Sequence, residues 1–202
     1  HESQSRLYES MLVRSLAFWK PVYPKLRETF PEQLTDVSLE QYVSAVNRAR
    51  AGLIRTEADE LTYCLHIMVR YEMEKLIFQE DARVEDLPAI WADKYEEYLG
   101  IRPLGYADGI LQDVHWAGGN FGYFPSYALG TAFAAQIYHR ICQDLPAEQL
   151  LEEGRPDEIH RYLKERLHCF GASRKTAELL REVCGEPFDP AYYIRYLEQK
   201  FG

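Results

Sequence analysis

The amino-acid sequence predicts a mainly α-helical fold, and three features of the 202-residue chain support this prediction. Apolar residues recur at helical spacing over most of its length. Proline and glycine, such as Pro21 and Gly100, stand where these periodic runs stop. Strand-like patterns are nearly absent, with at most a minor strand near Ile54, and no internal repeat is present. The expected architecture is therefore helical throughout.

The first half of the chain contains three predicted helices. The first covers residues 5–18, and we expect Pro21 and Pro24 to end it, because proline breaks the helical hydrogen-bond ladder. A short helix is predicted over residues 39–49. Thr56 and Asp59 fit a capping box, with Thr56 as the N-cap, ahead of the longest predicted helix, which extends to about Phe78.

The second half is predicted to hold a helix over residues 87–99, closed by Gly100, and then a glycine-rich stretch over residues 106–122. Loops of mixed aromatic and polar composition often carry functional sites. The remaining predicted helices cover residues 126–145, 147–153, 157–170, 175–183 and 190–201.

Composition narrows the possible functions. The chain is 47% hydrophobic, enough for a substantial core, and its length fits one domain better than two. A net charge of −9 without a basic cluster argues against nucleic acid as a partner. No apolar stretch approaches the roughly 20 residues that cross a bilayer. Four widely spaced cysteines fit reduced thiols, so we expect a soluble, cytoplasmic protein without a membrane partner.

Glu2 is the first candidate for chemistry. It lies in the opening motif H-E-S-Q-S-R, in which positions 2, 5 and 6 share a helix face. Glu2 could therefore point at a metal ion while Ser5 or Arg6 braces it. Ordinary capping chemistry in a first helical turn is the alternative interpretation.

Arg55 precedes the predicted N-cap of the long helix. Its guanidinium and the helix N–H groups could both bind an anion such as a peptide carboxylate. The competing interpretation is an ion pair with Glu57, Asp59 or Glu60 close by.

His115 follows Asp113 in the glycine-rich stretch, and a histidine oriented by a carboxylate can donate a hydrogen bond to a developing oxyanion. Tyr123 and Tyr127 follow, and a phenol is another suitable oxyanion donor. The alternatives are a buried structural histidine and tyrosines that only pack, since the chain has 15 tyrosines.

Together these motifs resemble those of the thermostable carboxypeptidase Taq family of zinc metallocarboxypeptidases. The resemblance rests on four segments in order, and it extends to the last predicted helix. The segments are H-E-S-Q-S-R at residues 1–6, I-R-T-E-A-D-E-L-T-Y at 54–63, G-I-L-Q-D-V-H-W at 109–116 and G-Y-F-P-S-Y at 122–127.

The resemblance implies a helical zincin-type body, with residues 1–202 forming the C-terminal part of a single catalytic domain. It implies that Glu2 is the third metal ligand and that Arg55 binds substrate. It also implies that His115, with Tyr123 or Tyr127, stabilises the tetrahedral intermediate, and the choice between the tyrosines stays open. The expected cofactor is zinc, or cobalt, and the expected assembly is a homodimer.

One departure from the family is large. The sequence contains no H-E-x-x-H, the helix motif that supplies two zinc-binding histidines and the general base, and it lacks an upstream motif with another substrate-binding arginine. The first residue is His1 rather than a methionine, so we expect that a segment upstream is missing. We also expect that this chain alone does not hold the metal stably, because one carboxylate is not a catalytic zinc site.

Two functional hypotheses follow. The first is a hydrolase that releases residues from peptide C-termini by metal-activated water, of which this chain is one part and an N-terminal segment bearing H-E-x-x-H is the other. The second is a catalytically inactive helical scaffold or interaction module that kept the family fold.

Overall fold

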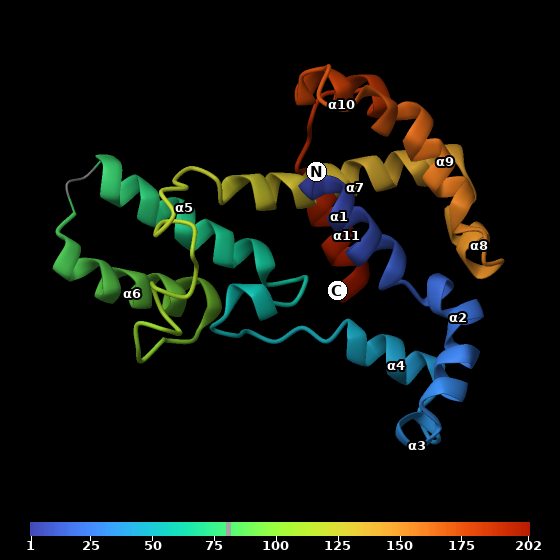
Figure 1. Ribbon diagram of the computed structural model, residues 1–202, viewed down its shortest axis with the longest axis horizontal. Helices are drawn as coiled ribbons and strands as arrows, with labels where there is room; N and C mark the ends of the chain where they lie inside the picture. Colours follow the sequence, from blue (N-terminus) through green and yellow to red (C-terminus); the bar gives the residue numbers. More distant parts are fainter. Residues whose placement is uncertain (80–81) are drawn as a thin grey trace. The chain divides into compact units, whose positions relative to one another are not determined.

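The computed structural model describes residues 1–79 and 82–202, and every regular element in this part of the chain is helical (Figure 1). The mainly α prediction is confirmed. Near Ile54 the backbone is extended, but no strand forms among the described residues. The chain divides into two compact units: a first unit of residues 1–47 and 130–202, and a second unit of residues 48–129.

The helices of the first unit come from both ends of the chain. Before residue 48 they are α1 (Glu2–Arg6), the π-helix η1 (Leu7–Val13), α2 (Leu16–Thr29), α3 (Pro31–Leu34) and α4 (Leu39–Val46). After residue 129 they are α8 (Ala147–Glu152), α9 (Pro156–Arg166), the 3-10 turn η4 (His168–Phe170), α10 (Thr176–Cys184) and α11 (Ala191–Phe201). The long helix α7 (Pro125–Asp144) begins in the second unit and ends in the first.

The predicted end of the first helix is wrong. Pro21 and Pro24 lie inside α2, which begins after Ser15, whose hydroxyl accepts a hydrogen bond from the Phe18 N–H at 3.2 Å. Both prolines are exposed. Since α2 packs on α4 and α8, tertiary contacts outweigh the local cost of two lost helical hydrogen bonds.

Within the first unit, α7 approaches α1 closely at Gly130. A Cβ atom on Gly130 would lie 2.5 Å from the Cβ of Glu2 and 3.1 Å from the Ser3 nitrogen. Only glycine therefore permits this backbone approach. The close contact fixes the first turn of the chain, which carries Glu2, against the central helix.

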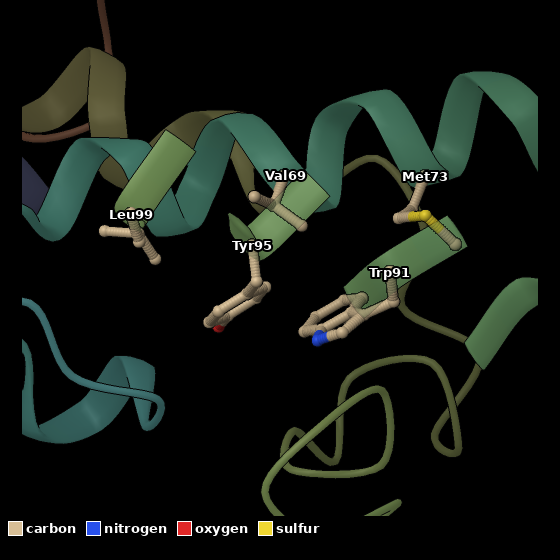
Figure 2. Packing of buried hydrophobic residues seen from close by; sticks show 5 residues of the cluster. All are labelled: Val69, Met73, Trp91, Tyr95 and Leu99. Atoms are coloured by element: carbon tan, nitrogen blue, oxygen red, sulfur yellow. The ribbon is translucent and has the colours of Figure 1, made fainter. Parts of the chain in front are cut away.

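The second unit contains the 3-10 turn η2 (Arg55–Glu57), α5 (Tyr63–Gln79), the 3-10 turn η3 (Val84–Asp86) and α6 (Leu87–Leu99). Helices α5 and α6 lie side by side (Figure 1). Figure 2 shows Val69 and Met73 of α5 beside Trp91, Tyr95 and Leu99 of α6, all of them buried. The Trp91 and Tyr95 rings stack with centroids 5.2 Å apart.

The predicted N-cap of the long helix is also wrong. Helix α5 begins at Tyr63 rather than after Thr56, and the capping side chain is Asp59. Its carboxylate accepts from the N–H of Thr62 at 2.9 Å and from the Thr62 hydroxyl at 2.9 Å. Residues 55–57 instead form the 3-10 turn η2, because an alternative carboxylate cap lies three residues further along.

The other predicted helices agree with the structure within a few residues, and Gly100 closes α6 with a φ of 68° as expected. The stretch predicted over residues 157–170 divides into α9 and η4. Residues 102–124, which contain the glycine-rich stretch, form turns and loops without a helix or strand.

Candidate functional site

Asp113 lies between two buried arginines of the second unit. Its Oδ1 accepts from Arg55 Nε at 2.8 Å and lies 2.7 Å from Arg55 Nη2, and its Oδ2 accepts from Arg70 Nε at 2.6 Å. Arg70 is 0% exposed and Arg55 is 8% exposed. The predicted alternatives for Arg55, an ion pair with one of three nearby acids, are wrong, since its partner is 58 residues away.

Gln112 joins the same three side chains to the loop. Its Oε1 accepts from the Arg55 backbone N–H at 2.8 Å and from Arg70 Nη2 at 2.8 Å. Its amide nitrogen donates to the carbonyl oxygens of Leu53 and Asp108, both at 3.0 Å. One buried amide thus sets the position of the Arg55 backbone relative to the 108–113 loop.

The two arginines differ in how fully their donors are used. Arg70 also donates from Nη1 to the His66 carbonyl at 2.7 Å and to the Tyr95 hydroxyl at 3.2 Å. Within residues 1–79 and 82–202, Arg55 Nη1 donates only to the Tyr63 hydroxyl, at 3.4 Å. Because a guanidinium has five N–H groups, Arg55 retains donor capacity for a further acceptor.

The charges of this cluster do not balance. Arg55 and Arg70 carry two positive charges against the one negative charge of Asp113. Burial acts to raise the pKa of Asp113, but the charges and hydrogen bonds of Arg70 and Arg55 outweigh it and hold the pKa below its usual range. Burial likewise acts to lower the pKa of Arg55, and Asp113 reverses that effect. Two further carboxylates of the second unit, Glu60 and Glu74, are also buried, so these three residues alone do not set the charge of the site.

His115 lies next to this cluster, in contact with aromatic rings. Its Nε2 is 3.0 Å from the Tyr127 hydroxyl, and its ring centroid is 4.4 Å from that of Phe124 and 6.1 Å from that of Tyr123. Its Nδ1 is buried and has no hydrogen-bond partner among the described residues. Burial, and then the Arg55 charge, lower the pKa of His115, so the imidazole is neutral at pH 7.

The expected orientation of His115 by Asp113 is wrong, because both Asp113 oxygens accept from the arginines and the imidazole contacts Tyr127 instead. Tyr123 and Tyr127 both lie in the cluster, with their ring centroids 5.3 Å apart. Arg55 approaches the face of Tyr127 at 5.3 Å. The structure therefore brings together four of the five predicted site residues: Arg55, His115, Tyr123 and Tyr127.

Glu2, the fifth predicted site residue, lies on α1 in the first unit and is partly exposed. Its motif is held by Gln4, whose Oε1 is 2.8 Å from His168 Nε2, and by the Ser5 hydroxyl, which donates to the Glu2 carbonyl at 2.9 Å. Across residues 1–79 and 82–202, no three His, Cys, Asp or Glu side chains gather in a way that could hold a metal ion. These residues alone do not fit a catalytic zinc, which normally takes three protein ligands.

Sequence reasoning missed two buried residues of α5, Arg70 and Glu74. With His66 they occupy positions i, i+4 and i+8, so they form one polar line along the buried side of the helix. That spacing was visible in the sequence. Ionisable residues in a line along a buried helix are a signal, because burying them without partners is costly.

Comparison with known proteins shows the family to which the chain belongs. Residues 1–201 match the model of the "Carboxypeptidase Taq (M32) metallopeptidase" family, and the chain belongs to that family. It is 49% identical to carboxypeptidase 1 of Bacillus subtilis and 45% identical to thermostable carboxypeptidase 1 of Thermus thermophilus, over 202 residues in each case. A solved structure of Pyrococcus furiosus carboxypeptidase matches all of this chain with a TM-score of 0.96 at 40% identity.

The chain covers only part of these proteins: 40% of the Bacillus protein, 39% of the Thermus protein and 41% of the Pyrococcus structure. In the part of the chain that the structure describes, no helix is both long and apolar enough to span a bilayer. The resemblance seen in the sequence motifs is thus confirmed at the level of family and fold.

Proposed function

We propose that this chain is the substrate-binding and oxyanion-stabilising part of a metallocarboxypeptidase, which hydrolyses peptides from their C-termini. The family match supports the reaction class. The structural observation that carries the assignment is the cluster in the second unit, where a buried arginine with donor capacity lies beside a neutral histidine and two tyrosines.

In this proposal Arg55 receives the C-terminal carboxylate of the peptide. Arg55 has N–H groups left to donate to an anion, and the ion pair with Asp113 fixes the orientation of its guanidinium. Because Arg55 is 8% exposed, the carboxylate would have to enter a largely desolvated site, where a charge-assisted hydrogen bond is strong.

His115 and Tyr127 would act as a pair on the oxyanion. With its proton on Nε2, the neutral imidazole donates to the Tyr127 oxygen, and the Tyr127 O–H is left to donate to the substrate. Tyr123 stacks on His115 and supplies a second phenol from the opposite end of the G-Y-F-P-S-Y motif. Separate substitutions of Tyr123 and Tyr127 with Phe can test which tyrosine is the oxyanion donor.

Glu2 is proposed as one metal ligand, completed by residues outside this sequence, in the H-E-x-x-H motif that the chain lacks. The bound ion, zinc or cobalt, would activate the attacking water. We further propose that both units belong to one catalytic domain and that the enzyme is a cytoplasmic homodimer acting on peptides.

The test uses a joined enzyme, in which an N-terminal segment bearing H-E-x-x-H precedes this chain and the total length equals that of the relatives. Its hydrolysis of matched peptides with free and amidated C-termini is measured. Arg55→Ala should lower kcat/KM by about 10- to 150-fold on free C-termini, the value of one charge-assisted hydrogen bond, and much less on amides. Arg102→Ala, which removes an exposed arginine of the same unit, is the matched control. An unchanged preference for free C-termini would show that Arg55 is only structural.

A second candidate function is a catalytically inactive helical scaffold, which the match in family and fold would equally allow. The joined enzyme separates the two functions. Stoichiometric zinc with chelator-sensitive hydrolysis supports the peptidase, whereas a folded, metal-free and inactive protein supports the scaffold.

A further inference from the structure

Glu74 is a buried carboxylate of α5 that contacts the loop carrying His115. The residue is 7% exposed. Its Oε1 accepts a hydrogen bond from the Trp116 indole Nε1–H at 2.8 Å, and its Oε2 accepts one from the Gly122 backbone N–H at 2.9 Å. Each oxygen of the carboxylate therefore binds one donor from the same loop.

The two donors lie at the two ends of the segment 116–122. Trp116 directly follows His115, and Gly122 directly precedes Tyr123. One side chain on a helix thus fixes the chain next to both members of the stacked pair His115 and Tyr123. Gly122 has a φ of 75°, a backbone conformation that favours glycine.

Packing supports the same geometry. The Trp116 ring meets Trp91 edge to face at a centroid distance of 5.9 Å and stacks on Phe121 at 6.3 Å. Rings alone can slide or tilt, whereas two hydrogen bonds to one buried anion define direction as well as distance. The loop end next to His115 is therefore held by both kinds of contact.

The chemistry requires a carboxylate at this position. An ionised carboxylate is an acceptor at both oxygens and matches two N–H donors. An amide of the same shape has one acceptor and one donor, so it would place an N–H group against one of the two loop donors. Glu74→Gln is consequently nearly isosteric but removes one hydrogen bond and leaves a buried donor unsatisfied.

We propose that Glu74 is a positioning residue, whose bridge to Trp116 and Gly122 sets the placement of His115 and Tyr123 for the reaction. This inference rests on the proposed function of those two residues. Glu74 acts through the loop. Among the described residues, it makes no hydrogen bond to the His115 imidazole or the Tyr123 phenol.

The bridge can be measured in the chain itself, without activity. Because a glutamine side chain keeps one acceptor oxygen, Glu74→Gln should break at least one of the two bonds: either hydrogen exchange at the Gly122 amide becomes about 10- to 150-fold faster, the range for a hydrogen bond to a charged group, or the Trp116 indole N–H signal shifts. The three indole N–H signals report separately, since those of Trp19 and Trp91 are buried and have no hydrogen-bond partner among the residues that the structure describes. If the Trp116 bond is the one broken, the Trp116 signal should shift most, and that of Trp91, whose ring contacts Trp116, should shift less.

Glu72→Gln is the matched control. Glu72 lies on the same helix and binds Lys94 and the Tyr98 hydroxyl of α6, away from the loop. Its substitution should leave Gly122 exchange and the Trp116 signal unchanged. If Glu74→Gln and Glu72→Gln behave alike, the bridge does not hold the loop and the proposal is overturned.

Kinetics of the joined, full-length enzyme test the consequence. Glu74→Gln should lower kcat by about 10-fold or more with little change in KM, because misplaced oxyanion donors weaken the transition state and not substrate binding. Loss of the bridge with an unchanged kcat would overturn the positioning role. If Glu74→Gln does not fold, Trp116→Phe removes one donor while keeping a ring, and full activity of that variant would also overturn it.

Failure of the proposed function gives a different result. A joined enzyme that is inactive even with Glu74 intact refutes the peptidase assignment. In that case the placement of His115 relative to Tyr123 is still read from their ring contacts by NMR, and their persistence in Glu74→Gln would refute the positioning role independently.

Discussion

Replacing Asp113 with asparagine is the most informative stability experiment, because one carboxylate serves two buried arginines. Its side chain is 9% exposed, and its ion-pair distances to Arg55 and Arg70 are 2.7 and 2.6 Å. An arginine that loses its carboxylate partner stays charged, because its guanidinium does not deprotonate in proteins. Asp113→Asn would remove the carboxylate that both guanidinium groups bind.

The expected cost is about 3–5 kcal/mol, the range for breaking a buried ion pair by removing one partner. That is a large part of the stability of an ordinary domain, about 5–15 kcal/mol. Urea unfolding followed by circular dichroism measures it. Asp93→Asn is the matched control, since Asp93 pairs with exposed Arg102 and should cost no more than about 1 kcal/mol.

A double-variant cycle tests the reasoning further. Arg55→Met removes one of the two positive charges and leaves Asp113 paired with Arg70. In the Asp113→Asn background the same change relieves charge repulsion, so the double variant should be more stable than the sum of the single losses predicts, by at least about 1 kcal/mol. Additive losses, or a cost of Asp113→Asn no greater than that of the control, would refute the account of the buried charges.

Acid should act on the same group. The folded-state pKa of Asp113 lies below its usual value, so the unfolded chain binds the proton more readily. The stabilisation is present above the unfolded pKa of about 4 and is lost as the pH falls through the lowered folded value. Below about pH 4, the stability of Asp113→Asn should therefore depend less steeply on pH than that of the parent.

Three further predictions concern His66, Gly130 and the chain as a whole. His66 is fully buried, and burial, followed by the Arg70 charge, lowers its pKa to about 4. The free energy of unfolding should therefore fall as the pH drops from about 6.5 to 4, by about 2 kcal/mol at pH 5. An NMR titration should show that His66 is still neutral at pH 5. Gly130→Ala should cost about 1–3 kcal/mol by thermal unfolding, because its Cβ would meet Glu2, whereas Gly52→Ala meets no atom within 4 Å and should change stability by less than about 0.5 kcal/mol. The 202-residue chain alone should neither bind zinc stoichiometrically in calorimetry nor hydrolyse peptides with added zinc, and chelator-sensitive hydrolysis would contradict this.

The errors of the sequence prediction have physical causes that local patterns do not contain. Pro21 and Pro24 have the properties of helix breakers, yet the packing of α2 on α4 and α8 keeps the helix intact. Thr56 and Asp59 fit a capping box, but Asp59 makes the better cap for a later start. In both cases a local rule competed with a contact that is absent from the local sequence.

The sequence by itself determined the helical class, the approximate bounds of most helices and the family. Hydrophobic periodicity and the order of motifs depend only on the order of residues along the chain. It also identified Arg55, His115, Tyr123 and Tyr127 as site candidates, which the structure gathers in one cluster.

Only the tertiary structure decided which groups are partners. Asp113 stands two residues from His115 in the sequence but pairs with Arg55 and Arg70, 58 and 43 residues away, and Glu74 reaches Trp116 and Gly122 across 42 and 48 residues. The reason is that a buried charge must form hydrogen bonds with whichever donors folding brings close to it. Burial depends on how the helices pack and not on the adjacent residues in the sequence.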